Sequence, residues 1–550
     1  MWGWELHFFR GAATRRWAKI AGTVRSPGVR IRRSRLLLGL GTLTACFGSG
    51  LVLAPAPAQA QCAVATDPCL TAADVTNATA AAAVAIGRDT MVIAVVDRGG
   101  NVLGVFRKAG APAQVVGNFG VMVDANDYAI GLARTGAFFS NDQAPLSSRT
   151  VRFISGIHFP PGVRNKPPAA LYGIENTNRG CDFGFAIPNV PRATNLAGGP
   201  CANGNTAGCG TGINTGKADL FDSNPTTVDG GGVPIFKNGR VAGGIGVSGI
   251  PPEAGEYAAF AGSIAGPAFG PRPASPAVIF LDGIRLPFVK NINRPGGETA
   301  GVFPGTGAFI AGPAASPLGP VGVPSGYLFG PNASAQLTAA QVNSVISRAN
   351  NQAQATRAAI RLPLGSTTRM VIAVAGLDGT ILGLFRMPDA TIFSIDVAVA
   401  KARNAIYFSS TGRDPRDLRG IPTGTAVSAR TIGFGAMPLF PPGINDTQPG
   451  PFFSNFVQDV ATPCSQGLDP NNLANQSGIV FFPGSLALYR GGQIVGGLGV
   501  SGDGVEQDDL VTAAGVTPDF VPPVGIRADQ VFVGGVRLPL FKFPRNPEVK

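Results

Sequence analysis

Apolar and polar positions alternate along this chain in blocks that occur twice in the same order. The stretch "MVIAVVDRGGNVLGVFR" at 91–107 returns as "MVIAVAGLDGTILGLFR" at 370–386. In each copy two apolar runs flank a Gly-containing turn, a pattern that predicts a tight β-hairpin because glycine adopts the positive φ values of such turns. The segment "GGIGVSG" at 243–249 likewise returns as "GGLGVSG" at 496–502. The pattern predicts a tandem repeat.

The repeated blocks also set the domain boundaries. The segment "SSRTVRF" returns as "SARTIGF", and "DGIRLPFVK" returns as "GGVRLPLFK", always in the same order. The first repeat therefore spans residues 70–290 and the second spans residues 337–543. Residues 291–336 between them are rich in Gly, Pro and Ala, a composition that predicts a linker.

Each repeat is expected to open with a helix. Thr71 in the first repeat and Thr338 in the second can cap it, with Asp74 or Gln341 three residues on, as in a capping box. After the first hairpin a second helix is predicted. In the second repeat its apolar positions recur at helical spacing and form one face, at Ile395, Val399, Ala402 and Ile406.

The glycines at 244–249 spell G-x-G-x-x-G, the fingerprint of dinucleotide-binding loops. That fingerprint needs a parallel βαβ unit in which the glycines turn from strand into helix. Here Asn238-Gly239 predicts a hairpin turn, so the glycine-bearing strand is the antiparallel return arm. Nucleotide binding is therefore not expected. The glycines are instead expected to bend the strand, or to let a helix or ligand approach its backbone.

Residues 1–60 combine a basic region, an apolar run and an Ala-x-Ala site, which together predict a secretory signal peptide preceded by a basic extension. They hold nine Lys and Arg and one acid, which leaves four of the twelve net positive charges to the rest of the chain. A nucleic-acid groove is therefore not expected. The exported chain would be periplasmic or extracellular, without a membrane span after cleavage. A membrane helix in place of the signal, and a lipid anchor at Cys46, are the weaker alternatives.

Six cysteines follow the expected cleavage site, and an even number in an exported chain predicts disulfides. Cys62–Cys69 and Cys201–Cys209 are close enough in sequence to close small loops. Cys181 and Cys464 would then remain, and could link the two repeats. Fifteen pairings are allowed, and free buried thiols are the alternative.

Three segments carry a family resemblance: the first hairpin, the "GGxGVSG" strand and "GVEQDDLVTAAG" at 504–515. Together they resemble the GlcG/HbpS family of haem-binding-like domains, which also includes the C-terminal domain of PduO-type proteins. The resemblance implies an α+β fold of two tandem profilin-like domains, each an antiparallel sheet with helices packed on it. We expect the two domains to pack as an intramolecular pseudo-dimer.

The two repeats depart from the family pattern to different degrees. "KARNA", starting at Lys401, resembles the family's K-A-x-T-A helix motif, whereas the first repeat has Leu132 at the aligned position. The acidic pair Asp508-Asp509 has no clear counterpart in the first repeat, unless Glu253 or Glu256 substitutes for it. The second repeat is therefore the better candidate for a ligand site.

Polar positions shared by the repeats are the other candidates for ligand contact. Matched S-x-R-T segments hold Arg149 and Thr150 in one repeat and Arg430 and Thr431 in the other. An arginine there could bind an anionic ligand such as a haem propionate, or form an internal salt bridge. Lys401 could contact a ligand or lie along the apolar helix face. His158 could bind haem iron, or be a loop histidine with no ligand.

No catalytic constellation is apparent in the sequence. It lacks G-x-S-x-G and H-E-x-x-H, and one histidine follows the expected cleavage site. The expected function is that of an exported, non-catalytic binding protein for haem or a similar tetrapyrrole or small ligand. The alternative is a structural or interaction module of the cell envelope. A weaker alternative, by family association alone, is an enzyme of glycolate or corrinoid metabolism.

Overall fold

The structure, a computed structural model, describes residues 62–63, 66–156, 159, 170–192, 196, 212–215, 230–266, 268–270, 279–281, 283–469 and 473–548. Three expectations lie outside these residues: the signal peptide at 1–60, the role of His158 and a Cys201–Cys209 bridge. Contacts gather Ala58–Lys550 into one compact unit, which contains both repeats. No helix in the described part of the chain combines the length and the apolar composition that a bilayer crossing requires.

The first repeat opens with a helix whose cap matches the prediction, because Thr71 and Asp74 form a capping box. Its elements, in chain order, are α1 (Ala72–Ala85), β1 (Val92–Asp97), β2 (Val102–Arg107), β3 (Gln114–Val116), η1 (Asn118–Gly120), β4 (Met122–Asp124), α2 (Ala125–Phe139), α3 (Ser148–Ile154), η2 (Ile174–Asn176), β5 (Gly232–Lys237), β6 (Arg240–Ser248), α4 (Pro252–Ser263), β7 (Phe280–Leu281) and β8 (Ile284–Arg285).

The second repeat keeps the main order of helix, two strands, two helices, two strands and helix, but among the described residues it lacks counterparts of β3 and β4 and adds the helix α8. Thr338 and Gln341 form the corresponding capping box. Its elements are α5 (Ala339–Ala355), β11 (Val371–Ala375), β12 (Ile381–Arg386), α6 (Phe393–Ser409), α7 (Ala429–Gly435), α8 (Phe453–Ala461), η3 (Leu473–Asn475), β13 (Ser485–Arg490), β14 (Gln493–Ser501), α9 (Val505–Val516), η4 (Val524–Ile526), η5 (Ala528–Gln530), β15 (Phe532–Val533) and β16 (Val536–Arg537).

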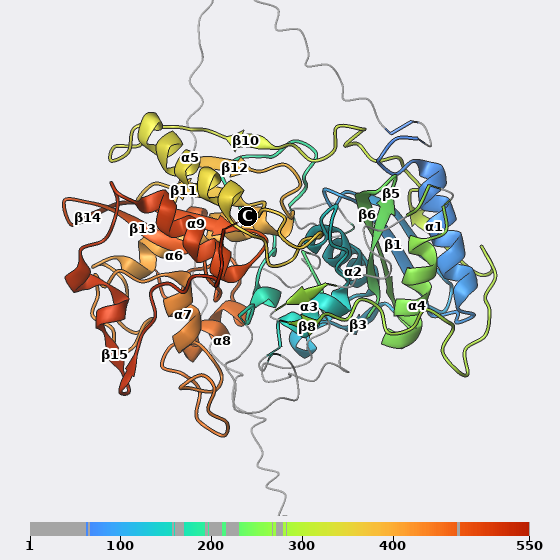
Figure 1. The fold of residues 1–550 in the computed structure, drawn as a ribbon. Coiled ribbons are helices and arrows are strands. Elements are labelled where there is room, and N and C mark those ends of the chain that lie inside the picture. Colours follow the sequence, from blue (N-terminus) through green and yellow to red (C-terminus); the bar gives the residue numbers. More distant parts are fainter. Residues whose placement is uncertain are drawn as a thin grey trace, which may run out of the picture. The chain divides into compact units, whose positions relative to one another are not determined.

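Each repeat is built on an antiparallel sheet covered by helices on both faces, which confirms the α+β prediction (Figure 1). The first sheet has the strand order β5-β6-β1-β2-β9 and the second has β10-β12-β11-β14-β13. In β1 alternate side chains point to opposite faces. Val92 and Ala94 pack with Ala129 of α2, while Ile93 packs with Val75 of α1. Every residue of β1 is therefore buried, and the strand carries no polar face.

The glycines of β6 and β14 let a helix lie directly against the strand. A Cβ atom built on Gly246 would lie 2.0 Å from the carbonyl oxygen of Ala129 in α2, and one on Gly499 would lie 2.1 Å from that of Ala398 in α6. β6 pairs antiparallel with β5, and Asn238 of their turn has a φ of 52°. The helix-approach interpretation is confirmed. β6 leads through a turn into α4, but its pairings with β1 and β5 are antiparallel, so the parallel βαβ unit of a nucleotide loop is not formed here.

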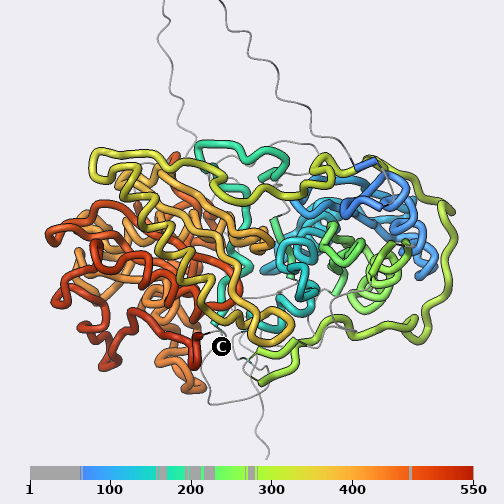
Figure 2. The backbone as a smooth tube through the Cα atoms, turned by 45° about the horizontal axis from the view of Figure 1, so that its top comes forward, coloured from blue at the N-terminus to red at the C-terminus, as the bar shows by residue number. Residues whose placement is uncertain are grey.

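Residues 291–336, predicted as a linker, also contribute a strand to each sheet. β9 (Ala308–Ala311) pairs with β2, and β10 (Gly326–Phe329) pairs with β12. Figure 2 shows this segment running from the first repeat to the second. Both strands lie at a sheet edge, where a Gly- and Pro-rich segment can pair on one side alone. The segment is thus part of both sheets as well as a connection.

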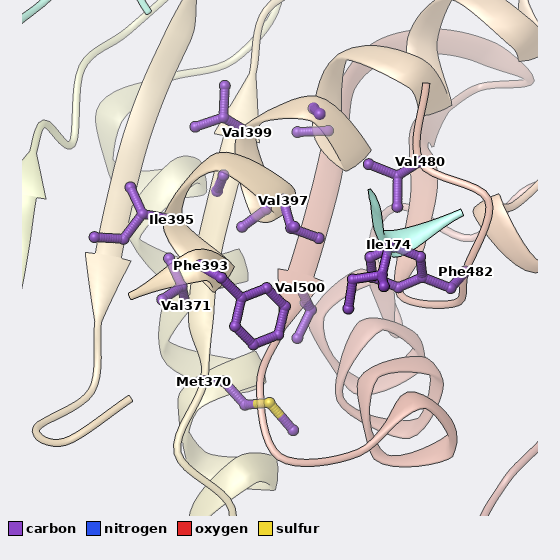
Figure 3. Packing of buried hydrophobic residues seen from close by; sticks show 14 of the residues in the cluster. Ile174, Met370, Val371, Phe393, Ile395, Val397, Val399, Val480, Phe482 and Val500 are labelled. Atoms are coloured by element: carbon purple, nitrogen blue, oxygen red, sulfur yellow. The ribbon is translucent and has the colours of Figure 1, made fainter. Parts of the chain in front are cut away.

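The two repeats contact each other through covalent, apolar and polar links. A disulfide joins Cys181 to Cys464, as proposed from the sequence, and Cys62–Cys69 closes the small loop. The rings of Phe139 and Phe393 stack with their centroids 4.1 Å apart. Ile174 of the first repeat belongs to the same buried cluster as Phe482 of the second (Figure 3).

Candidate functional site

Lys401 lies on α6 in the second repeat, and its side chain is completely buried. Its Nζ donates to the Val500 carbonyl oxygen at 2.7 Å and to Asp508 Oδ2 at 2.9 Å. The same nitrogen lies 5.0 Å from the centre of the Phe482 ring, within cation–π range. Burial lowers the pKa of Lys401, although Asp508 opposes this shift. Lys401 is thus held as one half of a buried ion pair.

Asp508 lies in the first turn of α9, where the helix dipole favours a negative charge. Its side chain is 3% exposed. Burial raises the pKa of Asp508 to about 7, although Lys401 lowers it. Within the described residues its Oδ1 atom is buried without a hydrogen-bond partner. Such an atom is costly unless a water or ligand satisfies it.

Arg430 of α7 forms the second ion pair at this place. Its Nε donates to Asp509 Oδ2, and Asp509 Oδ1 accepts from the Gly484 backbone nitrogen at 3.1 Å. Burial raises the pKa of Asp509, and Arg430 opposes the shift. Arg430 Nη2 is buried and has no partner among the described residues. We call Lys401, Arg430, Asp508 and Asp509 the charge cluster.

The first repeat replaces half of the charge cluster. Ala129 of α2 and Ala398 of α6 lie against equivalent glycines, Gly246 and Gly499, which aligns the two helices. Three residues further on, Leu132 therefore occupies the position of Lys401. Counting from the equivalent strand ends, Gly255 occupies the position of Asp508 and Glu256 that of Asp509. The lysine and its carboxylate are therefore both absent from the first repeat.

The remaining pair of the first repeat is fully engaged. Arg149 donates from Nε and from Nη2 to the two carboxylate oxygens of Glu256, at 2.6 and 3.1 Å. The Lys290 backbone nitrogen donates to Glu256 at 2.8 Å, as that of Lys542 does to Asp509 at 3.0 Å. Glu256, rather than Glu253, is thus the counterpart of Asp509. The extra methylene of glutamate allows the two-point contact that Asp509 does not make.

Thr150 and Thr431 make matching contacts within the chain. Each is the third residue of a capped helix, and each hydroxyl donates to a proline carbonyl oxygen, Pro287 at 2.5 Å and Pro539 at 2.6 Å. These prolines belong to segments 286–290 and 538–542, which we call the tails. A ligand role for either threonine stays a prediction.

The structure brings Lys401, Arg430 and Thr431 together in the second repeat, and places Arg149 and Thr150 at the matching place of the first. Arg107 and Arg386 end the matched strands β2 and β12, and each donates to a backbone carbonyl oxygen near its own strand. Asp508 and Asp509 are the ion-pair partners of Lys401 and Arg430, and the sequence alone did not predict these pairs. In the sequence they stand out as an acidic pair a few residues after "GGLGVSG".

Asp97 ends β1 and lies at the turn of the first hairpin. It is fully buried and accepts hydrogen bonds from the backbone nitrogens of Gly99 and Asn101 and from the Ser316 hydroxyl. Burial raises the pKa of Asp97 to about 6, against these hydrogen bonds. The contacts hold the β1–β2 turn against the segment between the repeats.

We expect the destabilisation caused by Asp97→Asn to be about 1 kcal/mol larger at pH 5 than at pH 7.5. Because the folded state holds the Asp97 proton more tightly than the unfolded chain, this carboxyl contributes stability at low pH and loses it as the pH rises through about 6. Urea unfolding of both proteins at the two pH values measures the difference. A difference that is constant, or larger at pH 7.5, would contradict the buried-acid assignment.

Three potential metal ligands gather in the described residues at Cys62, Asp67 and Cys69. The two cysteines are joined in a disulfide, so neither offers the thiolate that binds a metal ion. We therefore do not assign a metal site to these three residues.

Comparison with known proteins finds a family match within the second repeat. Residues 337–517 match a family described as "Haem degrading protein HbpS-like", which confirms the resemblance for this repeat. The corrinoid adenosyltransferase PduO of Salmonella typhimurium strain LT2 is 27% identical over 155 residues, 28% of this chain and 33% of that protein. The chain thus spans about a third of the length of this curated relative.

Two solved structures are also similar to part of the chain. Klebsiella pneumoniae protein ORFY is 18% identical, covers 34% of this chain and 94% of its own, and gives a TM-score of 0.22. The PduOC:heme complex is 21% identical, covers 34% of this chain and 99% of its own, and gives a TM-score of 0.22.

Proposed function

We propose that the second repeat binds haem or a similar tetrapyrrole, and that the first repeat supports it structurally. The match of residues 337–517 to a haem-related family carries this proposal. The charge cluster supports it, because the second repeat keeps two buried ion pairs and the first repeat replaces one of them with Leu132 and Gly255. In the pair that the first repeat keeps, Arg149 already donates from Nε and Nη2 to Glu256, whereas Arg430 Nη2 has no partner among the described residues.

The described residues fit one part of a haem molecule. A haem propionate is a carboxylate, and Arg430 Nη2 is a guanidinium donor without a partner among the described residues. The described residues include no cysteine thiolate or histidine that could bind the haem iron. The described cysteines are in disulfides, and both histidines of the chain lie outside the described residues. We therefore assign the carboxylate contact to Arg430 and assign no iron ligand.

Access to Arg430 passes along the second tail. The Arg430 side chain is 15% exposed, so it reaches solvent, while its Nη2 atom is buried. Two hydrogen bonds hold this tail: the Thr431 hydroxyl donates to the Pro539 carbonyl oxygen, and the Lys542 backbone nitrogen donates to Asp509. Ligand binding in our proposal includes a small movement of this tail, which frees the guanidinium without breaking the Lys401–Asp508 pair.

We expect saturable binding of haemin to the purified protein at micromolar concentration, seen as a shift of the Soret band. Because the proposed contact is to a carboxylate, protoporphyrin IX, which lacks iron, should bind within about threefold of haemin. Absence of saturation with both compounds would refute tetrapyrrole binding. Tight binding of haemin alone would show that an iron ligand such as His158 dominates, and would remove Arg430 from the central role.

Export and a non-catalytic role are part of the same proposal. They are supported by the signal-like sequence at 1–60 and by the lack of hydrolase or metalloprotease motifs in the sequence. Fractionation of the producing cells tests export, because a chain that stays at its full length in the cytoplasm would contradict it. The protein should also leave bound haemin chemically unchanged, which its absorption spectrum over several hours reports.

A second candidate function is a structural or interaction module without a small ligand. The extensive links between the repeats favour it. Arg361 pairs with Asp503 and Asp389 of its own repeat and donates to Gln143 of the first repeat at 3.0 Å. A protein built for rigidity would show no saturable tetrapyrrole binding, so the same titration separates the two candidates.

A further inference from the structure

A cavity of about 330 Å³ lies in the first repeat, between α3 and the first tail. The described residues of its walls are mainly apolar, namely Phe153, Leu286, Phe288, Val289 and Ile292, and Arg285 is the charged residue among them. Leu286 and Phe288 are buried, whereas Ile292 is 55% exposed and Arg285 is exposed. The cavity therefore has an apolar floor and a rim that carries one cation.

Comparison of the repeats explains why the first tail leaves space. The tails align residue by residue, so Val289 corresponds to Phe541, and just beyond the tails Asn291 corresponds to Phe543. In the second repeat the rings of Phe541 and Phe543 stack with their centroids 6.0 Å apart. The first tail carries neither ring. In the cavity wall Val289 thus stands where the second repeat has the larger Phe541.

The wall behind the tail is the same in both repeats. Phe153 packs edge-on against Phe159 at 5.5 Å, and Phe434 packs edge-on against Phe440 at 5.7 Å. The tail is also fixed in the same way, because Ser147 and Ser428 donate to the carbonyl oxygens of Phe288 and Leu540. The scaffold is therefore shared, and the side chains of the tail distinguish the first repeat.

We propose that this cavity binds a small molecule with an apolar body and one carboxylate. Its volume is near the lower end of the roughly 300–1,000 Å³ typical of small-molecule sites, which are mainly apolar with a few polar groups that fix orientation. The apolar body would lie against Phe153, Leu286 and Phe288. The carboxylate would face Arg285, whose guanidinium can donate two parallel hydrogen bonds. This site is separate from the charge cluster, which belongs to the second repeat.

Decanoate, titrated into the full-length protein below its micellar concentration and followed by calorimetry, tests the proposal. We expect saturable binding at one site per chain. Val289→Phe, which introduces the residue that the second repeat already accommodates, should weaken decanoate binding at least tenfold because the ring fills the cavity. Absence of saturation with the unaltered protein, or unchanged affinity in Val289→Phe, would overturn the proposal.

Two rim variants keep the test independent of packing effects. Ile292→Glu changes an exposed side chain, so the fold is retained, and the added carboxylate should repel decanoate and weaken its binding several-fold. Arg285→Gln should weaken decanoate binding about threefold and leave decanol binding unchanged, since decanol has no charge to pair. Equal effects of Arg285→Gln on both compounds would show that the cation does not select the ligand.

Phe541→Val, the reverse change in the second repeat, should leave decanoate binding to the first repeat unchanged.

Discussion

Lys401→Leu is expected to lower the free energy of unfolding by about 3–5 kcal/mol, the usual cost of removing one partner from a buried ion pair. The side chains of Lys401 and Asp508 are 0% and 3% exposed, so the remaining carboxylate would stay buried without its cation. The Val500 carbonyl oxygen would also lose its ammonium donor. Urea unfolding, followed by circular dichroism at pH 7.5, measures the loss.

Addition of Asp508→Gly to Lys401→Leu should recover most of that loss. The double variant reproduces the arrangement of the first repeat, where Leu132 is buried and Gly255 stands at the helix position of the acid. About 1 kcal/mol should remain, because glycine is a poor residue inside a helix. Leu132→Lys in the first repeat is the matched control and should destabilise by a similar amount. If the effects of the two second-repeat changes simply add, the pair does not act as a unit.

Removal of the bridge between the repeats by Cys181→Ser and Cys464→Ser should cost on the order of 5 kcal/mol of stability. The two cysteines are 283 positions apart in sequence, and the entropy that a cross-link removes from the unfolded chain grows with the length of the closed loop. Thermal and urea unfolding of the variant under oxidising conditions provide the measurement. Contacts such as the Phe139–Phe393 stack should keep the repeats together in the folded variant.

The small bridge provides the matched control for this prediction. Cys62 and Cys69 are seven positions apart, so the same relation gives a loss of only about 2 kcal/mol for Cys62→Ser with Cys69→Ser. A larger loss from the small loop than from the long one would contradict the view that Cys181–Cys464 is the main covalent constraint between the repeats.

Local patterns predicted much of the fold, because they depend on neighbouring residues. Thr71 with Asp74 and Thr338 with Gln341 form the expected capping boxes, and Asn238-Gly239 forms the expected turn. The strands of residues 291–336 were not predicted. Each is four residues long in a Gly- and Pro-rich segment, and their pairing depends on an exposed sheet edge supplied by distant parts of the chain.

The sequence identified two candidate site residues but not the acids that pair with them. Lys401 and Arg430 were identified from their motifs, yet their counter-charges depend on how α9 is placed against α6 and α7. Three-dimensional packing brings Asp508 to Lys401 across 107 positions in sequence, and Asp509 to Arg430 across 79. Such long-range pairs leave no local pattern. The structure shows that Leu132 and Gly255 occupy the positions of Lys401 and Asp508, so both members of this pair are replaced in the first repeat.

We propose above all that the second repeat binds a tetrapyrrole through Arg430 Nη2, which has no partner among the described residues. The most direct measurement is haemin affinity in Arg430→Lys and in Arg149→Lys, because each variant keeps the positive charge but replaces the three guanidinium nitrogens by a single ammonium nitrogen. Arg149 Nη2 is already bonded to Glu256, whereas Arg430 Nη2 is not bonded to any described residue. We predict at least tenfold weaker haemin binding in Arg430→Lys and unchanged binding in Arg149→Lys. Equal affinities in the two variants, or a larger loss in Arg149→Lys, would contradict the account.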